Sequence, residues 1–265
     1  MEKEIREALS PDYPWADRFH YFDTIDSTNN YLKKLAAEGA PHGTVAVANC
    51  QTGGKGRLGR SFQSPGGVGV YLSILLRPEC PPEELMHLTC AVGVAMCDAV
   101  EQAAGIRPAI KWINDLVCGK QKIAGILAEL GMGPDGNVSY AVVGIGINCC
   151  QTLQDFPEEL RGRAASLAMV TGQPIDRARV AAAMMAELAK MDETLFTGKE
   201  AMLQRYRADC ITLGQQISLV RGDEIRHGLA LDVGGTGDLI VRFPDGHQEA
   251  VSCGEVSVRG MYGYV

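Results

Sequence analysis

The chain has 265 residues, of which 46% are hydrophobic and 22% are charged, proportions that are typical of a globular protein and exclude disordered and fibrous classes. This length fits one large domain, or a large domain with a small satellite. Lys and Arg number 25 against 32 Asp and Glu, so the net charge of −7 makes the chain a poor general binder of nucleic-acid phosphates, although a local basic patch would still be able to bind them.

The nine cysteines indicate reduced thiols. Their number is odd, Cys149 and Cys150 are adjacent, and no C-x-x-C spacing occurs, which argues against a disulfide framework and against a zinc ribbon. The first residues carry no apolar signal segment, and no run of 18 apolar residues is present to cross a membrane. We therefore expect a cytoplasmic protein without membrane association and without a protein-bound metal.

Residues 1–19 carry Pro11 and Pro14 and are expected to form a short extension, too short for a helix-turn-helix module. Ser27 and Thr28 are expected to cap a helix that runs to about Glu38 and ends at Gly39. The segments predicted after it, in chain order, are a strand at 44–50, a Gly-rich basic loop at 52–69, a strand at 70–76, a helix from Pro81 to Gly105, short strands at 109–112 and 116–118, strands at 122–130 and 138–147, and helices at 176–194 and 199–209.

After residue 212 the sequence pattern changes. Five short apolar runs, separated by Gly and Asp, lie at 216–220, 228–233, 239–243, 249–253 and 256–259. Short strands at this spacing are typical of a small β-barrel. We therefore expect three parts: an extension at 1–19, a main domain at 20–211 and a small barrel at 212–265.

The most distinctive local sequence is GGKGRLGR at residues 53–60, in which three cations stand among four glycines. Glycine lets the backbone approach a ligand, and backbone N–H groups together with Lys and Arg can surround an anion. The alternative is a mobile surface turn with solvated charges, but the density of both residue types favours a phosphate site. The stretch also contains G-x-G-x-x-G, yet a strand follows it instead of the helix that a dinucleotide fold requires.

Several other residues admit both a chemical and a structural interpretation. Lys122 opens an apolar strand, where its ammonium could neutralise charge that develops on a carboxylate or simply reach solvent. Asp115 follows Asn114 in a pair typical of a turn, but it could also accept a proton from an amine. Gly144 and Gly146 lie inside a strand, which marks either the close approach of a ligand or a tight packing contact.

Five motifs in this order resemble those of the biotin–protein ligases, which attach biotin to the carrier domain of a carboxylase. The motifs are DSTN at 26–29, QTGGKGRLGR at 51–60, KWIND at 111–115, KIAGILAE at 122–129 and GIGIN at 144–148. The resemblance covers about residue 20 to the end. It implies an α+β fold, in which a biotin/lipoate ligase-type catalytic domain with a mixed sheet, residues 20–211, binds biotin and ATP and is followed by a small C-terminal SH3-like β-barrel, residues 212–265.

Three positions depart from the pattern of the family. Lys55 stands where Arg is usual, which keeps the charge and loses the bidentate fork. Phe62 stands where some members have Trp, and Ile113 stands where Pro is usual. None of these changes removes a group that the chemistry needs.

The resemblance also implies roles for individual residues. Biotin is expected to contact Ser27, Thr28, Asn29, Gln51, Lys55, Gly56, Arg57, Lys122, Gly125 and Leu127; ATP is expected to contact Arg57, Arg60, Phe62, Asn114, Lys122 and Asn148, with Phe62 stacked on adenine. The expected reaction begins when the biotin carboxylate attacks the α-phosphate of Mg-ATP, giving biotinyl-5′-AMP. Lys122, Arg57 and Lys111 would offset charge in that step. Asp115 would then orient or deprotonate the acceptor lysine of the carrier.

The implied partner is the biotin carboxyl carrier protein, or carrier domain, of acetyl-CoA carboxylase or a related carboxylase. DNA binding is not expected, because family members with repressor activity carry an N-terminal helix-turn-helix domain that this sequence does not show. A homodimer stays open, since edge strands could pair chains. Three rivals remain: a lipoate or octanoate ligase or transferase of the same fold, against which Gln51 beside the basic loop favours biotin; a DNA-binding repressor, which the acidic charge opposes; and a nucleotide-dependent oxidoreductase.

Overall fold

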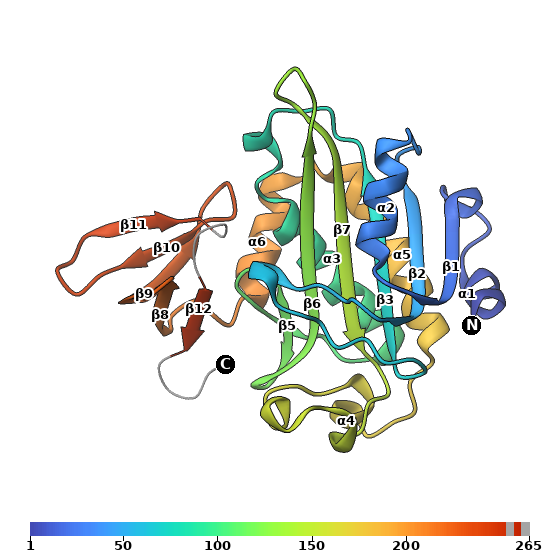
Figure 1. The fold of residues 1–265 in the computed structure, drawn as a ribbon. Helices are drawn as coiled ribbons and strands as arrows, with labels where there is room; N and C mark the ends of the chain where they lie inside the picture. Colours follow the sequence, from blue (N-terminus) through green and yellow to red (C-terminus); the bar gives the residue numbers. More distant parts are fainter. Residues whose placement is uncertain (253–256, 261–265) are drawn as a thin grey trace.

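The computed structural model describes residues 1–252 and, as backbone, residues 257–260. It shows a main body built on a seven-stranded sheet, with a smaller sheet beside it (Figure 1). The strand order is β1-β2-β3-β7-β6-β5-β4; β1 pairs with β2 in parallel and the other neighbours pair antiparallel, so the sheet is mixed, as expected. The strands are β1 (Phe19–Ile25), β2 (Thr44–Gln51), β3 (Gly69–Leu76), β4 (Ala109–Lys111), β5 (Asp115–Cys118), β6 (Gln121–Met132) and β7 (Val138–Asn148).

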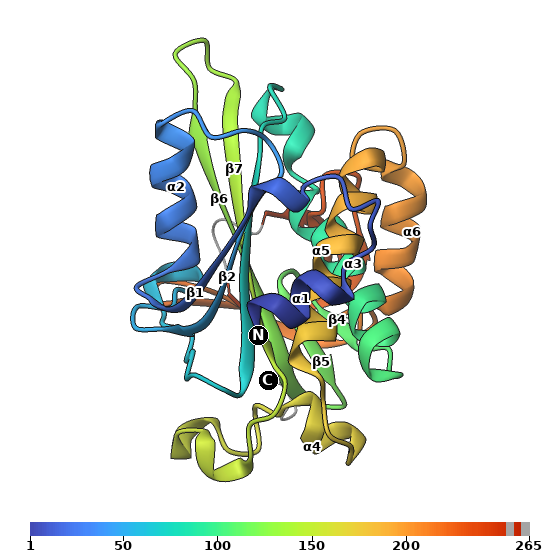
Figure 2. The same ribbon diagram turned by 90° about the vertical axis from the view of Figure 1, so that its right-hand side faces the viewer.

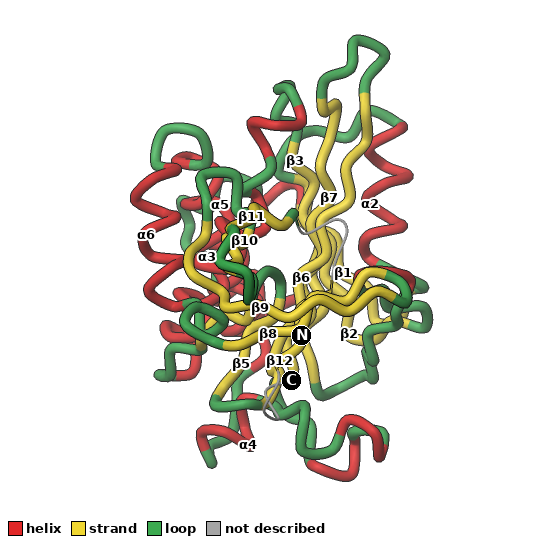
Figure 3. Tube along the Cα trace, turned by 90° about the vertical axis from the view of Figure 1, so that its left-hand side faces the viewer, coloured by secondary structure: helices red, strands yellow, loops and turns green. Residues whose placement is uncertain are grey.

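Helices cover both faces of this sheet. One face carries α2 (Thr28–Ala37), and the other carries α3 (Leu88–Ala104), α5 (Arg177–Thr194) and α6 (Lys199–Asp209) (Figures 2 and 3). The N-terminal residues pack onto the main body through α1 (Glu2–Ala8), which contacts α5 and buries Ile5. The remaining short helical segments are η1 (Ala16–Arg18), η2 (Arg57–Gly59), η3 (Pro82–Leu85), η4 (Leu153–Asp155), η5 (Glu158–Leu160) and α4 (Leu167–Thr171).

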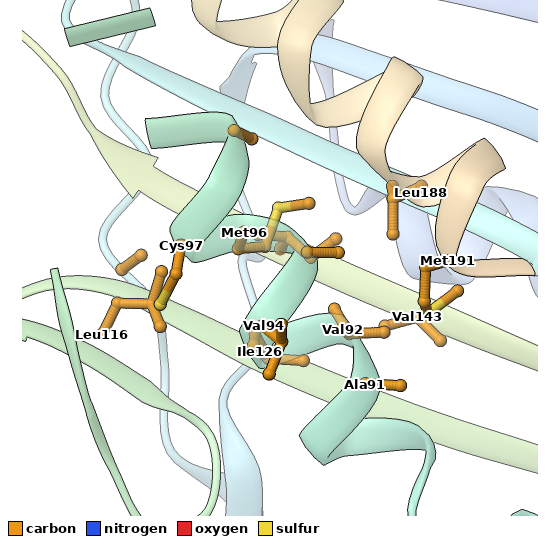
Figure 4. Close-up of a cluster of buried hydrophobic side chains, with 14 of the residues drawn as sticks. Ala91, Val92, Val94, Met96, Cys97, Leu116, Ile126, Val143, Leu188 and Met191 are labelled. Atoms are coloured by element: carbon orange, nitrogen blue, oxygen red, sulfur yellow. The ribbon is translucent and has the colours of Figure 1, made fainter. Parts of the chain in front are cut away.

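The layer between the sheet and α3 is the centre of the core. Val92 of α3, Val143 of β7 and Met191 of α5 belong to one cluster of buried apolar side chains (Figure 4). Each such side chain stabilises the fold by roughly 1.5–3 kcal/mol relative to leaving it in water. This packed layer holds the strands in place, so their opposite face can carry polar groups.

Most predicted elements of the main body are confirmed, but β1 and α4 received no prediction and the start of α3 differs. The segment that became β1 received no prediction, because its short run mixes polar and aromatic residues. The helix expected from Pro81 begins instead as a 3-10 turn, η3, and α3 starts only at Leu88. Pro82 suits the first position of a helical turn, but buried His87, whose Nε2 lies 2.8 Å from the Leu195 carbonyl oxygen, fixes the junction before α3 begins.

The smaller sheet is antiparallel throughout, in the order β11-β10-β9-β8-β12, and confirms the expected SH3-like C-terminal unit. β9 starts earlier than predicted, because a two-residue turn at Gly222 (φ +58) lets Arg221 pair with Glu224 at once. The predicted run at 249–253 ends at Cys253, and the predicted run at 256–259 begins at Val256. Both of these residues lie outside the described part of the chain. The strands are β8 (Gln216–Arg221), β9 (Glu224–Val233), β10 (Leu239–Arg242), β11 (Gln248–Val251) and β12 (Ser257–Gly260).

Candidate functional site

A pocket of about 750 Å³ is lined by Ser27, Thr28 and Asn29 at the start of α2 and by residues of the central strands. Its floor is a patch of small residues on the central strands. Gly125 of β6 pairs with Gly146 of β7, and Gly144, two residues earlier in β7, pairs with Ser73 of β3. Directly paired residues point to the same side of a sheet, so these positions leave a shallow space above the strands.

Two of these glycines are required by neighbouring side chains. A Cβ atom at Gly146 would collide with the ring of Phe62, and a Cβ atom at Gly144 would collide with the amide of Asn29. The sequence left open whether the glycines serve a ligand or a packing contact. In this structure they make room for Phe62 and Asn29, two residues expected to bind substrates, and so place both on the floor of the pocket.

The N-terminus of α2 forms one end of the pocket. Ser27 caps the helix by accepting a hydrogen bond from the Asn30 N–H. Thr28 donates from its backbone N–H and its hydroxyl to Gln51 Oε1, at 2.9 and 3.0 Å. Gln51 in turn donates to the Ser64 hydroxyl at 3.1 Å. The structure thus joins the end of β2 to the start of α2 through the polar groups that the sequence assigned to biotin.

A network that the sequence did not predict supports this end. The Ser73 hydroxyl lies 2.5 Å from Asn29 Oδ1, and Asn29 Nδ2 donates to Glu129 Oε2 at 2.8 Å. Lys33 Nζ lies 2.6 Å from Glu129 Oε1. Burial raises the pKa of Glu129, but the hydrogen bonds from Lys33 and Asn29 outweigh it and hold that pKa below its usual value. The one signal in the sequence was the spacing of Asn29 and Lys33, which puts them on the same side of a helix.

The opposite wall carries the groups expected to act in catalysis. Lys122 Nζ lies 2.7 Å from Asp115 Oδ1, as in an ion pair, and 5.8 Å from the centre of the Phe62 ring. Asp115 pairs with Lys111 across β4 and β5. Burial lowers the pKa of Lys111 below its usual value. Arg57 reaches this wall from the basic loop and donates to Asn114 Oδ1 at 3.0 Å.

The basic loop folds back on itself beside the pocket. The Gly56 N–H donates to the Arg60 carbonyl at 2.7 Å, and between them Leu58 adopts a left-handed conformation with φ +55. Lys55 Nζ reaches Asn30 Oδ1 on α2 at 2.7 Å. The loop therefore spans from α2 to the KWIND segment, and its cations line the pocket.

A second segment that the sequence left without a role closes another side. It follows β7, contains η4 and η5, and lines the pocket with Phe156, Leu160 and Arg163. The Arg163 carbonyl accepts from the Lys122 N–H at 2.8 Å, which attaches this segment to β6. Its sequence has no long periodic pattern, so neither its structure nor its position could be predicted.

All the residues that the sequence nominated lie in this one pocket, while the atoms that each contacts in a substrate stay a prediction. They are Ser27, Thr28, Asn29, Gln51, Lys55, Gly56, Arg57, Arg60, Phe62, Lys111, Asn114, Asp115, Lys122, Gly125, Leu127 and Asn148. Within residues 1–252, no group of three or more His, Cys, Asp or Glu side chains could hold a metal ion. No helix in the described part of the chain is long and apolar enough to cross a membrane.

Known proteins share both parts of this architecture. Residues 21–148 match the model of the biotin/lipoate A/B protein ligase family, and residues 212–259 match that of the biotin protein ligase C terminal domain. The biotin–[acetyl-CoA-carboxylase] ligase of Mycobacterium tuberculosis is 31% identical over 236 residues, which cover 87% of this chain and 85% of that protein. The biotin protein ligase from Aquifex aeolicus in complex with biotin and ATP has a TM-score of 0.77 and 29% identity, with 92% of this chain and 99% of that chain covered.

The relative with the higher identity is longer. The bifunctional ligase/repressor BirA of Bacillus subtilis is 40% identical over 179 residues, which make up 68% of this chain and 54% of that protein. The chain therefore spans about half the length of that relative.

Proposed function

Because the chain belongs to the biotin protein ligase family, we propose that it activates biotin with ATP and transfers the biotinyl group to a lysine of a biotin carboxyl carrier protein. One observation carries this proposal: Lys122, paired with Asp115, shares a single pocket with the Thr28–Gln51 cluster and the cations of the basic loop. The cluster offers hydrogen-bonding groups for the uncharged polar head of biotin, and the cations suit a carboxylate and phosphates.

In the first step a biotin carboxylate oxygen attacks the α-phosphorus of ATP. A new P–O bond forms, the bond to the bridging oxygen breaks, and pyrophosphate leaves with biotinyl-5′-AMP as the other product. Mg²⁺ enters with ATP as part of that substrate. The chain's own contribution is position and charge: Lys122, Lys111 and Arg57 lie where they would offset negative charge as it builds up on the phosphate oxygens.

In the second step the amine of a carrier lysine attacks the acyl carbon of biotinyl-5′-AMP. An amide bond forms, the bond between the acyl carbon and the phosphate oxygen breaks, and AMP leaves. The amine must lose a proton, and the Asp115 carboxylate is the group of this wall that would accept it. The partner that we propose is the carrier protein or carrier domain of acetyl-CoA carboxylase or a related carboxylase, and the compartment that we propose is the cytoplasm.

The test is ATP–pyrophosphate exchange by the purified protein with biotin, with lipoate and with no acid. We expect exchange that depends on biotin, followed by transfer of biotin to a carrier domain when one is added. Exchange with lipoate alone would keep the fold and change the substrate. No exchange with either acid, in folded protein supplied with Mg-ATP, would show that the proposed activity is wrong.

A further inference from the structure

Gln151 is a buried polar residue of the pocket to which the sequence gave no role. It stands three residues after Asn148, just beyond the end of β7, and it lines the pocket although only 3% of the residue is exposed. The Ser166 hydroxyl donates to the Gln151 carbonyl at 2.6 Å. The backbone of Gln151 is therefore fixed, and the side chain has a defined place.

Its neighbours also determine which way the amide of Gln151 is turned. The Ala165 backbone carbonyl can only accept a hydrogen bond, so it must face Nδ2 of Asn148, at 3.1 Å. Asn148 then presents Oδ1 to Gln151, and an oxygen there requires the Gln151 Nε2 group, which lies 3.0 Å away. The Gln151 Oε1 atom is consequently on the other side of the amide, as an acceptor.

That acceptor has no partner within the described part of the chain, although it is buried. A buried carbonyl oxygen without a hydrogen bond is unfavourable, because it has lost water and gained nothing in return. A ligand that supplies an N–H or O–H group would satisfy it. A carboxylate or a phosphate would not, since each presents acceptors of its own.

We infer that Gln151 Oε1 accepts a hydrogen bond from the exocyclic amino group of adenine and thereby selects a 6-aminopurine over a 6-oxopurine nucleotide. The inference rests on the proposed function, in which this pocket binds ATP. The substrates carry two other kinds of donor: the ureido N–H groups of biotin, which are expected at Ser27 and Thr28 at the start of α2, and the ribose hydroxyls of ATP, which purine riboside 5′-triphosphate retains. Gln151 instead contacts Asn148, which belongs to the group of residues expected at the nucleotide.

The experiment compares three nucleotides in biotin-dependent pyrophosphate exchange: ATP, purine riboside 5′-triphosphate, which lacks the 6-amino group, and inosine 5′-triphosphate, which has an oxygen there. In the unsubstituted protein we expect kcat/KM to fall at least about tenfold from ATP to each analogue, because a site built to pair with a donor rejects a ligand that lacks one. In Gln151→Met we expect about a tenfold loss with ATP and an unchanged value with purine riboside 5′-triphosphate. The matched control is Gln154→Met, an exposed glutamine of the same segment, which should leave both values unchanged.

Two results would overturn the inference. An equal loss with ATP and with purine riboside 5′-triphosphate would mean that Gln151 holds Asn148 in place or meets a ribose hydroxyl, and that it does not read the amino group. No loss with either nucleotide would mean that its acceptor meets no ligand donor. If the unsubstituted protein shows no exchange at all, the proposed function fails while the inference stays testable. Equilibrium dialysis with ATP and with purine riboside 5′-triphosphate then decides whether Gln151→Met removes a preference for the amino group.

Discussion

Lys122 and Asp115 contact one another at 2.7 Å, but the two proposed steps require different things of them. A cation is needed while the carboxylate attacks the α-phosphate, and a proton acceptor is needed while the carrier amine attacks the acyl carbon. The two side chains are only partly exposed, at 33% and 23%, so each lies close enough to the pocket to serve one of the steps. Substitutions can therefore separate the steps.

We predict that Asp115→Asn slows transfer more than activation. The amide has nearly the shape of the carboxylate but cannot take a proton, so single-turnover transfer from preformed biotinyl-5′-AMP to a carrier domain should fall about a hundredfold, within the usual range for loss of a general base. ATP–pyrophosphate exchange should fall only a few-fold. Lys122→Ala is the comparison, since the loss of charge stabilisation should reduce exchange at least about a hundredfold. If Asp115→Asn slows both steps equally, Asp115 only positions Lys122.

These residues could be predicted because each belongs to a contiguous motif, such as KWIND or KIAGILAE. The residues that hold the pocket in place could not be predicted, since their contacts join distant parts of the chain. Asn29 and Glu129 are 100 residues apart, and Ser73 and Thr28 are 45 apart. Nothing local in a strand such as β3 distinguishes Ser73, whose hydroxyl is buried against α2, from a serine that faces solvent.

α2 holds the polar end of the pocket, and its position depends on more than its cap. The cap at Ser27 could be expected from the sequence, whereas the attachment of the helix to β6 through the Lys33–Glu129 pair appears only in the fold. Because Asn29 donates to the same carboxylate, Glu129 fixes both the distance of α2 from the sheet and the orientation of the Asn29 amide. Glu129 does not line the pocket, so it acts through Asn29 as a positioning residue.

We predict that Glu129→Gln raises the KM for biotin about tenfold while the KM for ATP stays constant, because only the α2 end of the pocket moves. The free energy of unfolding at neutral pH should fall by about 1–2 kcal/mol, since a partly exposed ion pair and a hydrogen bond are both weakened. Glu38→Gln is the control, because Glu38 and Lys34 pair on the exposed side of the same helix. Equal changes in both KM values would argue against a positioning role.

The same variant has a predicted pH signature. The pKa of Glu129 in the folded protein is below its usual value of 4.5, so its ionised form stabilises the fold above that value and this contribution disappears as the pH falls through the folded pKa. Urea unfolding at neutral pH and in acid should therefore show a smaller acid-induced loss of stability in Glu129→Gln than in the unsubstituted protein. An identical loss in both would mean that Glu129 contributes nothing to the acid sensitivity.

The order of most helices and strands could be predicted, because α3, α5 and the central strands have apolar patterns long enough to show their period. The position of the C-terminal sheet relative to the main sheet could not be predicted. Apart from apolar packing and an ion pair between Arg207 and Asp232, the C-terminal unit contacts the main body through its backbone: Arg207 of α6 donates to the Val233 carbonyl, and Trp112 donates from Nε1 to the Gly237 carbonyl at 2.9 Å. Backbone carbonyls carry no residue signature, so a sequence gives no sign of such contacts.

Trp112 is the point where the C-terminal unit and the pocket meet. It lines the pocket within the KWIND segment, its backbone N–H donates to Thr212 at 2.9 Å, and its indole donates to the turn between β9 and β10. Lys111 and Asn114 flank it in that segment. Docking of the C-terminal sheet should therefore stabilise the conformation in which these side chains face the pocket, although no residue of β8–β12 lines the pocket in the part of the chain that the structure describes.

We predict that Trp112→Phe, which keeps an aromatic ring but removes the N–H donor, leaves the Gly237 carbonyl without its partner and loosens both sides of this contact. Hydrogen–deuterium exchange should rise in residues 111–118 and 234–239 and stay constant in α2, and kcat/KM for ATP in pyrophosphate exchange should fall about tenfold. Trp15→Phe is the matched control, because Trp15 is buried against Tyr13 and His42 of the main body and does not line the pocket. If exchange rises only in 234–239 while kcat/KM is unchanged, the C-terminal unit is attached through Trp112 but does not influence the pocket.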